Sequence, residues 1–340
     1  MRLAAHRYWP RVASSLVVGV VLAAGVAACQ GDQAWTAYTV EDGLAHDAVE
    51  SVATGPDGVV WAATHAGVSR VDGQEWTTYT SQDAPIDSRI HDLATGADGE
   101  VWVGSGKGVA SYDGEQWTRH DGLPDWPVTA ITVIDEGEVL AVSDGVYRSD
   151  GQRWRRVEGS PHQQVGSLAV ADDGTVWMAP TTVIDGEALF EFEGQEWTDH
   201  VTRENADITS DHADGEVVPG RVVRDLEVAD GALWAGTDEG LASYEYGTWS
   251  RHVVDDGLPQ GGVQALTVDR DGDVWLAIAE EDATDPEYAV AHFDGQRWNS
   301  YTTADGLPDG RINDLTVDDD GTVWAATSAG LASFHADDPA

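Results

Sequence analysis

Residues 305–331 read DGLPDGRINDLTVDDDGTVWAATSAGL, and the chain contains seven variants of this stretch. The shared elements are DGLP, VxxL, DxDGxVWxxT and GLASY, and a DGxxW segment closes each copy. A repeat of roughly 40–45 residues is typical of a stacked or closed array, because one repeat cannot bury its own apolar face. The repeat therefore predicts one large repetitive domain.

Tryptophan marks two positions in the repeat. The first is the VW or LW pair, where Leu140 fills the slot in the third copy and the tryptophans are Trp61, Trp102, Trp177, Trp234, Trp275 and Trp324. The second is the closing segment, with Trp35, Trp76, Trp117, Trp154, Trp197, Trp249 and Trp298. We interpret both series as framework: large apolar rings between repeats, each with an indole N–H to satisfy.

Each copy is expected to form four short strands, A to D. Strand A is the VxxL segment, strand B the VW segment, strand C the GLASY segment, and strand D carries the closing Trp. Asp-Gly or Glu-Gly pairs follow strand A, and they favour tight hairpins because Gly accepts a positive φ. No segment after residue 30 resembles a long amphipathic helix. The expected fold class is all-β, a seven-bladed β-propeller of four-stranded blades.

The two ends of the repeat array predict how the ring closes. The seventh copy lacks its own Trp strand, whereas residues 32–38, DQAWTAY, match residues 73–79, GQEWTTY. The N-terminal strand is therefore expected to complete the last blade, which removes the open edges of a linear array. The propeller domain is placed at residues 32–340.

The first 28 residues are interpreted as a bacterial lipoprotein signal peptide. Arg2, Arg7 and Arg11 form a basic start, and the apolar run that follows is too short for a membrane span. The run ends in VAAC, which resembles a lipobox that directs cleavage before Cys29 and lipid attachment to it. We expect residues 29–31 to be a lipidated tether and the protein to be exported, anchored on the outer face of the cell membrane. The alternative is that Cys29 is a buried free thiol.

The charge of the chain is extreme, with 61 acidic and 18 basic residues and a formal net charge of −43. Such a field repels nucleic acid and anionic lipid headgroups, so neither is an expected partner. It also destabilises a compact fold at low salt through self-repulsion. A saline habitat and an acidity that serves solubility remain alternative explanations.

One position of strand A differs in every copy. It is occupied by Glu50, His91, Thr129, Gly166, Arg224, Gln264 and Asn313, which we call the variable ring. Strand A is the innermost strand of a propeller blade, so the variable ring should face the central channel near one mouth. Unlike, mostly polar residues in one register suggest a ligand-recognition surface. The alternative is a water-filled channel without a ligand.

Long insertions point to the same face of the ring. Loops from strand D to A and from B to C share one face of a propeller, and three insertions fall there, at residues 181–187, 201–220 and 280–287. They should gather around blade five, beside Arg224, as functional loops on a rigid scaffold often do. Further ligand-binding candidates on this face are Trp126, Lys107, His65 and Asp238.

Several cations flank this mouth. Arg89, Arg221 and Arg311 lie next to strand A, and positive residues at one mouth of an acidic body would focus an anionic or polar ligand there.

Chemical motifs are absent: the sequence has no HExxH, CxxC, GxSxG or P-loop. The acidic stretches 269–273 and 318–321 resemble calcium loops but coincide with the A-to-B hairpins, so we interpret them as turns. Weak metal candidates are Asp211, Asp214 and Glu216 in the insertion before blade five. No cofactor is expected, with calcium as an open alternative.

The unit DGLP, VxxL, DGxVWxxTxxGL resembles the two-component regulator propeller repeat, with residues 305–331 as the best copy and a likeness across residues 32–340. The resemblance implies an extracytoplasmic sensor propeller, often linked to polysaccharide sensing, and streptogramin B lyases are related seven-bladed propellers. The chain shows no kinase core, so signalling is not implied directly.

Three interpretations follow. The first is an anchored, non-catalytic, monomeric propeller that binds a small molecule or glycan at the blade-five face. The second is a cell-surface protein-interaction scaffold. The third is a propeller lyase or hydrolase.

Overall fold

The computed structural model describes residues 35–56, 58–87, 89–124, 126–135, 138–151, 153–160, 165–171, 173–181, 187–193, 196–201, 218, 220–252, 258, 260–279, 288–294, 297–308 and 310–335. These residues form seven four-stranded antiparallel sheets, which are the blades of a propeller. The predicted fold class is therefore confirmed. The expected signal peptide, the tether and Cys29 lie outside the described residues.

The first four blades follow the order A to D expected from the repeat. Blade one is β2 (Val49–Thr54), β3 (Val60–Thr64), β4 (Gly67–Asp72) and β5 (Glu75–Tyr79). Blade two is β6 (Ile90–Thr95), β7 (Val101–Ser105), β8 (Gly108–Tyr112) and β9 (Trp117–His120). Blade three is β10 (Ala130–Asp135), β11 (Glu138–Val142), β12 (Val146–Ser149) and β13 (Trp154–Arg156). Blade four is β14 (Val165–Val170), β15 (Val176–Pro180), β16 (Glu187–Glu193) and β17 (Glu196–Val201).

The last three blades include the closure. Blade five is β18 (Val223–Ala229), β19 (Ala232–Thr237), β20 (Gly240–Glu245) and β21 (Thr248–His252). Blade six is β22 (Gly262–Val268), β23 (Val274–Ala279), β24 (Tyr288–Phe293) and β25 (Trp298–Tyr301). Blade seven is β26 (Ile312–Val317), β27 (Thr322–Thr327), β28 (Gly330–His335) and β1 (Thr36–Tyr38), and the short 3-10 helix η2 (Thr303–Asp305) precedes it.

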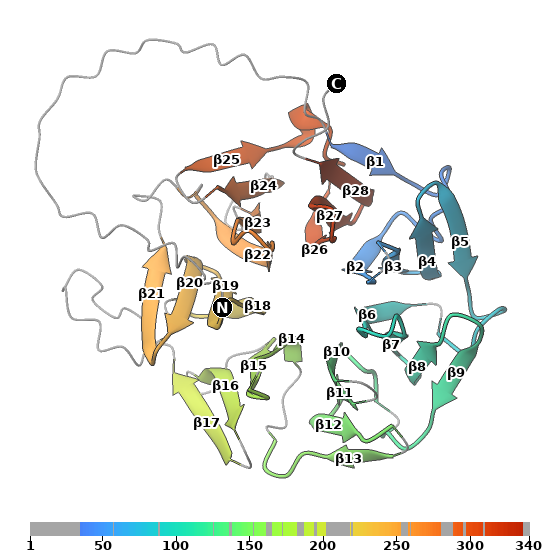
Figure 1. The fold of residues 1–340 in the computed structure, drawn as a ribbon, viewed down its shortest axis with the longest axis horizontal. Helices are drawn as coiled ribbons and strands as arrows, with labels where there is room; N and C mark the ends of the chain where they lie inside the picture. The colour runs from blue at the N-terminus through green and yellow to red at the C-terminus, as the bar shows by residue number, and fades with distance from the viewer. Residues whose placement is uncertain are drawn as a thin grey trace, which may run out of the picture.

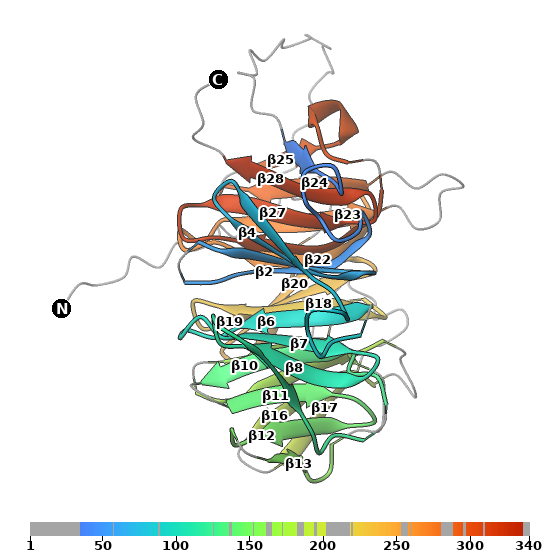
Figure 2. The ribbon, with the colours of Figure 1, turned by 90° about the vertical axis from the view of Figure 1, so that its right-hand side faces the viewer.

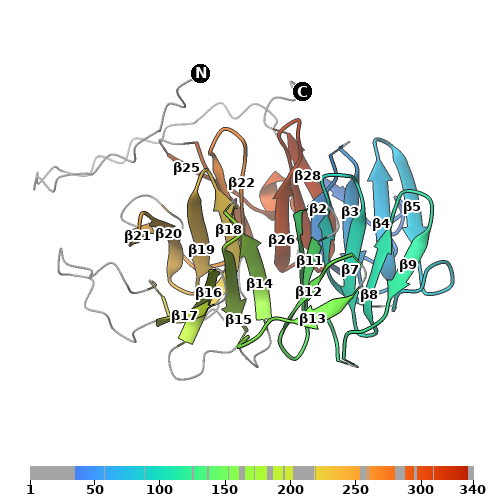
Figure 3. The same cartoon turned by 60° about the horizontal axis from the view of Figure 1, so that its bottom comes forward.

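The blades surround a central channel. Their first strands lie innermost and their last strands form the rim (Figure 1). The ring is a flat disc whose strands cross its thickness (Figures 2 and 3). One face carries the loops between blades together with the B-to-C turns at residues 65–66, 106–107, 238–239 and 328–329; we call it the loop face. The opposite face carries the A-to-B turns and is called the turn face.

The A-to-B turns have the chemistry expected from their Asp-Gly pairs. Gly321 adopts a φ of 87°, which a residue without a Cβ adopts most easily. The carboxylate of Asp318 accepts from the backbone N–H groups of Asp320 and Thr322 at 3.1 and 2.9 Å. Asp269 accepts from Asp271 and Asp273 in the same way, at 2.9 Å each. These acidic stretches are therefore hairpin turns, as expected.

The N-terminal strand closes the ring as predicted. β1 pairs antiparallel with β28, with Thr36 opposite Ser333 and Tyr38 opposite Leu331. Just before β1, the N–H of Trp35 donates to the carbonyl of Asp305 at 2.8 Å, and its ring packs against Phe334. The first and last described segments of the chain therefore belong to one blade (Figure 1).

The core lies between neighbouring blades and is built around the framework tryptophans. Trp275, for example, stacks on the ring of His292, with 3.9 Å between the ring centroids, and belongs to the same core cluster as apolar side chains of blade seven. At five framework tryptophans the indole N–H has no acceptor among the described residues: Trp35, Trp117, Trp249, Trp275 and Trp298. At these sites the ring is surrounded by other aromatic and apolar side chains, so packing decides its position.

Blade three is the weakest copy of the pattern. Leu140 takes the place of the strand-B Trp, and a small void of about 10 Å³ lies between blades three and four, lined by Leu140, Phe192 and Trp197 among others.

Within the described residues, no helix has the length and hydropathy needed to cross a bilayer.

Candidate functional site

The variable ring sits on β-bulges. In blade one, Val49 pairs with Thr64 and Ser51 pairs with Ala63, so Glu50 has no partner of its own in the ladder. The same skip of one residue occurs in five other blades, at His91, Gly166, Arg224, Gln264 and Asn313. In blade three, Thr129 and Ala130 both lie opposite Val142. A bulge redirects a side chain out of the regular pleat, and this explains why one position of strand A is free to vary.

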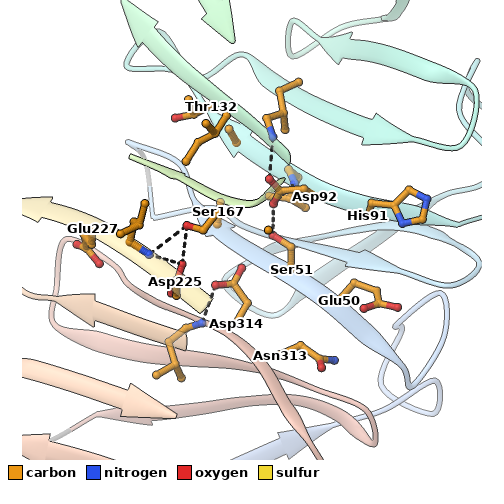
Figure 4. A pocket seen from close by; sticks show the side chains of 18 of the residues that line it. Glu50, Ser51, His91, Asp92, Thr132, Ser167, Asp225, Glu227, Asn313 and Asp314 are labelled. Atoms are coloured by element: carbon orange, nitrogen blue, oxygen red, sulfur yellow. Dashed lines mark hydrogen bonds between the residues drawn. The ribbon is translucent and has the colours of Figure 1, made fainter. Parts of the chain in front are cut away.

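All seven residues of the variable ring line one cavity in the channel. The cavity has a volume of about 370 Å³, within the range of small-molecule sites. Figure 4 shows Glu50, His91 and Asn313 near its edge and Ser51, Asp92, Asp225 and Asp314 around its centre. The structure thus brings the predicted ring together; its role in ligand binding stays a prediction.

Two members of the ring hold neighbouring blades. The amide of Asn313 donates to the carbonyl of Val49 in blade one at 2.7 Å. The hydroxyl of Thr129 donates to the carbonyl of Val165 in blade four at 3.1 Å. Asn313 and Thr129 therefore have a structural role in addition to any contact with a ligand.

Charged groups converge where blades one and two meet the loop face. The Glu50 carboxylate accepts from Arg89 at 2.8 Å and also hydrogen-bonds the ring of His65. Burial alone would raise the pKa of Glu50, but the hydrogen bonds from His65 and Arg89 outweigh it, and the pKa is lowered. Burial, followed by the nearby Arg89 charge, lowers the pKa of His91. At neutral pH His91 therefore offers a neutral imidazole to the cavity.

Three cations of the loop face form ion pairs. Arg89 contacts Glu50, the ammonium of Lys107 lies 3.1 Å from Asp87, and Arg221 lies 3.6 Å from Asp238. These ion pairs reduce the positive field that an anionic ligand would meet at this mouth.

The predicted site residues outside the cavity lining have different surroundings. The Asp238 carboxylate accepts from the backbone N–H groups of Arg221 and Val222 at 2.7 and 3.1 Å, so it shapes the loop that leads into blade five. Trp126 is 61% exposed, although large apolar side chains of the described residues are otherwise mostly buried. The insertions at residues 182–186, 202–217 and 280–287, and with them Asp211, Asp214 and Glu216, lie outside the described residues.

Three aspartates next to the variable ring went unrecognised in the sequence. Asp92 in blade two accepts from Ser51 of blade one at 3.0 Å and from the N–H of Ile131 of blade three at 2.8 Å. Asp225 in blade five accepts from Ser167 at 2.9 Å and from the N–H of Leu266 at 2.8 Å. We call Asp92, Asp225 and Asp314 the inter-blade carboxylates.

Asp314 has the same role at the closure. It accepts from the N–H of Val52 in blade one at 2.9 Å and from its own neighbour Leu315 at 2.8 Å. The signal was present in the sequence, because the residue after the variable ring reads Ser51, Asp92, Ala130, Ser167, Asp225, Ala265 and Asp314. Compared between copies, this position reads Ser-Asp-Ala in blades one to three and again in blades four to six.

Asp92, Asp314 and Glu227 of the cavity lining have raised pKa values, in contrast to Glu50. Burial raises the pKa of Asp92 to about 6. Burial and the Asp225 charge raise the pKa of Asp314 to about 8. Glu227, deeper in the same cavity, also reaches a pKa of about 8, mainly through burial. Acidic groups packed into one cavity are thus partly protonated at neutral pH.

Among the described residues, no group of three or more His, Cys, Asp or Glu side chains is arranged to hold a metal ion. The channel carboxyls are occupied by backbone N–H and hydroxyl donors. In the stretches 269–273 and 318–321, Asp269 and Asp318 accept from backbone N–H groups of their own turns. Calcium binding stays an open alternative.

The closed ring of seven four-stranded blades, with a polar cavity in its channel, places the chain among the seven-bladed β-propellers. Residues 306–329 match the family model described as two component regulator propeller, which confirms the resemblance seen in that copy. None of the curated proteins compared with the chain matches it in sequence.

Solved structures share the fold at low identity. The extracellular domain of the hybrid two component system BT3049 from B. thetaiotaomicron has a TM-score of 0.70 and 14% identity, covering 90% of this chain and 41% of that one. A streptogramin B lyase has a TM-score of 0.68 and 14% identity, covering 88% and 97%. YCF48 bound to D1 peptide has a TM-score of 0.64 and 16% identity, covering 89% and 96%. The chain thus spans about two fifths of the BT3049 domain, and the likeness shows the fold.

Proposed function

We propose that this chain is an exported, lipid-anchored propeller that binds a small or oligomeric polar ligand in the channel cavity, without catalysis, as a sensor domain does. The observation that carries the proposal is the variable ring: seven unlike residues, one from each blade, line a single cavity of about 370 Å³. A ring of unlike residues at one bulged position of a repeated strand resembles a binding site placed on a fixed scaffold.

The comparisons support this choice of function. BT3049 and the one component system BT4673 were each solved as an extracellular domain, and both share this fold. The lipobox at Cys29 supports export and anchoring at the membrane. A glycan is a suitable ligand class, because the cavity presents hydroxyl, amide, imidazole and carboxyl groups that pair with sugar hydroxyls.

A second function, a protein-interaction platform, is favoured by one observation. Trp126 projects from the loop that leads into blade three and is 61% exposed, and exposed Trp residues are frequent anchors in protein interfaces. A propeller of the same fold was solved with a bound peptide. The third candidate, an enzyme, has the Glu50 and His65 pair in its favour but no identified substrate position.

The test is a thermal melt and titration calorimetry of the chain from Gln30 onward, with panels of oligosaccharides and of peptides. A ligand that binds the folded state at about 100 times its Kd stabilises it by roughly 2.7 kcal/mol, which a melt detects. Arg224→Ala should abolish the shift, because Arg224 lines the cavity. Arg270→Ala is the matched control, since Arg270 lies on the turn face and pairs with Asp319.

Each outcome decides between the functions. A saturable sugar-dependent shift that Arg224→Ala removes and Arg270→Ala keeps supports the binding propeller. A response to peptides alone, lost in Trp126→Ala, supports the platform instead.

A further inference from the structure

Glu227 is an exception within the repeat. The third residue after the variable ring is alanine or threonine in the other six copies, namely Ala53, Ala94, Thr132, Ala169, Thr267 and Thr316. Blade five alone has a charged side chain there. Small residues suit a position where seven strands converge on a channel, so a glutamate at this place is not required by the scaffold.

The surroundings hold the Glu227 carboxyl in place. Arg224 and Asp225 of the same strand, β18, line the same cavity, and Figure 4 shows Glu227 at its side. The N–H of Val268 in blade six donates to Glu227 Oε2 at 3.2 Å, and the Thr267 side chain also hydrogen-bonds the carboxyl. A carboxyl group has about four acceptor sites, and one donor when protonated, so it keeps hydrogen-bonding capacity toward the cavity.

We propose that the Glu227 carboxyl recognises the ligand at the inner part of the channel cavity and selects uncharged, hydroxyl-rich ligands over anionic ones. The inference rests on the proposed binding function and adds the ligand class and the residue that determines it.

The charges that face Glu227 explain the selection. Asp225 on β18 and Asp314 on β26 are the carboxyl neighbours whose charges act on it. Burial, together with these neighbours, raises the pKa of Glu227 to about 8, so at neutral pH it carries a proton and can donate to a hydroxyl oxygen. An anionic ligand would instead meet the ionised carboxylates of Glu50 and Asp92, since the pKa of Glu50 is lowered and that of Asp92 is about 6. Arg89 and Lys107 at the mouth are already paired with carboxylates, and Arg224 is the cation of the cavity lining itself.

The experiment uses neutral disaccharides and trisaccharides, each beside its uronic acid counterpart, measured by calorimetry on the purified protein. Three variants accompany the wild type. Glu227→Gln keeps the shape and a donor without a charge, and Glu227→Ala removes the group. Glu100→Gln is the control, because Glu100 is half-buried with a pKa raised by burial but lies outside the cavity.

The expected result has three parts. At least one neutral sugar binds, and its uronic acid counterpart binds at least tenfold more weakly. Glu227→Gln retains the affinity within about threefold, whereas Glu227→Ala loses about tenfold, the effect of one lost hydrogen bond. Wild-type affinity falls between pH 7 and 9 as Glu227 ionises. This pH dependence is reduced in Glu227→Gln, where Asp314 with its pKa of about 8 still titrates, and it is unchanged in Glu100→Gln.

Two different failures can be told apart. If a sugar binds but its uronic acid counterpart binds as well or better, or Glu227→Ala binds normally, the inference is wrong and the proposed function stands. If no sugar in the panel binds the wild type, the glycan-binding function and this inference fall together.

Discussion

The hydroxyl of Ser51 donates to Asp92 across the boundary between blades one and two at 3.0 Å, and Ser167 repeats this relation with Asp225 at 2.9 Å. Each aspartate also accepts from a backbone N–H of the blade that follows. One carboxylate therefore joins three successive blades. Blades three and six have Ala130 and Ala265 at the position of these aspartates, so they contribute no such link.

Removal of one inter-blade carboxylate should lower the free energy of unfolding by more than the small volume of the deleted group suggests. Asp92→Ala leaves the N–H groups of Leu93 and Ile131 without their acceptor. Unsatisfied buried donors cost about 1–3 kcal/mol each, so we expect a loss of about 2–4 kcal/mol in the free energy of unfolding. Urea denaturation measures it. Asp92→Asn, which keeps one acceptor oxygen, should lose about half as much, and equal stability of Asp92→Ala and the wild type would refute the role.

The channel carboxyls predict how stability depends on pH. Their folded-state pKa values are raised, to about 6 for Asp92 and about 8 for Asp314, so the folded state binds more protons than the unfolded state between the ordinary Asp pKa near 4 and those values. Stability must then fall as pH rises through this window. The thermal midpoint should decrease from pH 5 to pH 8. Asp314→Asn should flatten the slope, and an unchanged slope would contradict the assignment.

The boundary between blades three and four should open first. Ala130 supplies no carboxylate there, and a void lined by Leu140 and Trp197 shows that the packing is incomplete. Regions with fewer buried links exchange amide hydrogens at lower free energy. Hydrogen exchange should therefore be faster for β10 and β14 than for β2 and β6. Uniform protection around the ring would show that this boundary is not weak.

Closure by the N-terminal strand predicts a strong effect of Trp35. Its side chain is 4% exposed and packs against Phe334, so Trp35→Ala should cost about 3–5 kcal/mol, as core Trp deletions do. Trp126→Ala is the comparison, since that ring is 61% exposed and should change the free energy of unfolding by less than about 0.5 kcal/mol. Chemical denaturation of both variants tests the contrast. Similar losses would mean that β1 does not complete blade seven in solution.

Salt should stabilise this protein. A formal net charge of −43 opposes compaction, and counterions screen that repulsion. The thermal midpoint should rise between 10 mM and 1 M NaCl, consistent with a saline habitat. A midpoint independent of NaCl would favour the solubility explanation for the acidic composition.

The sequence was informative where the same residue recurs, and less so where partners come from different blades. The Trp series, the Asp-Gly turns and the match between residues 32–38 and 73–79 predicted the ring and its closure. The variable ring was found because it differs between copies. The inter-blade carboxylates were missed, since nothing in a single copy says that Asp225 reaches both Ser167 and Leu266. The pairing of Lys107 with Asp87 also depends on loop geometry that the repeat does not encode.

The bulge at each variable-ring position has an evolutionary consequence. Because Glu50 and its counterparts lie at bulges, a substitution there leaves the pairing of the neighbouring strand residues unchanged. Asn313 and Thr129 are exceptions, since their side chains also hold neighbouring blades. At the other positions, the chemistry of the channel can change one blade at a time without a large loss of foldability, so related chains can diverge there while they inherit one fold.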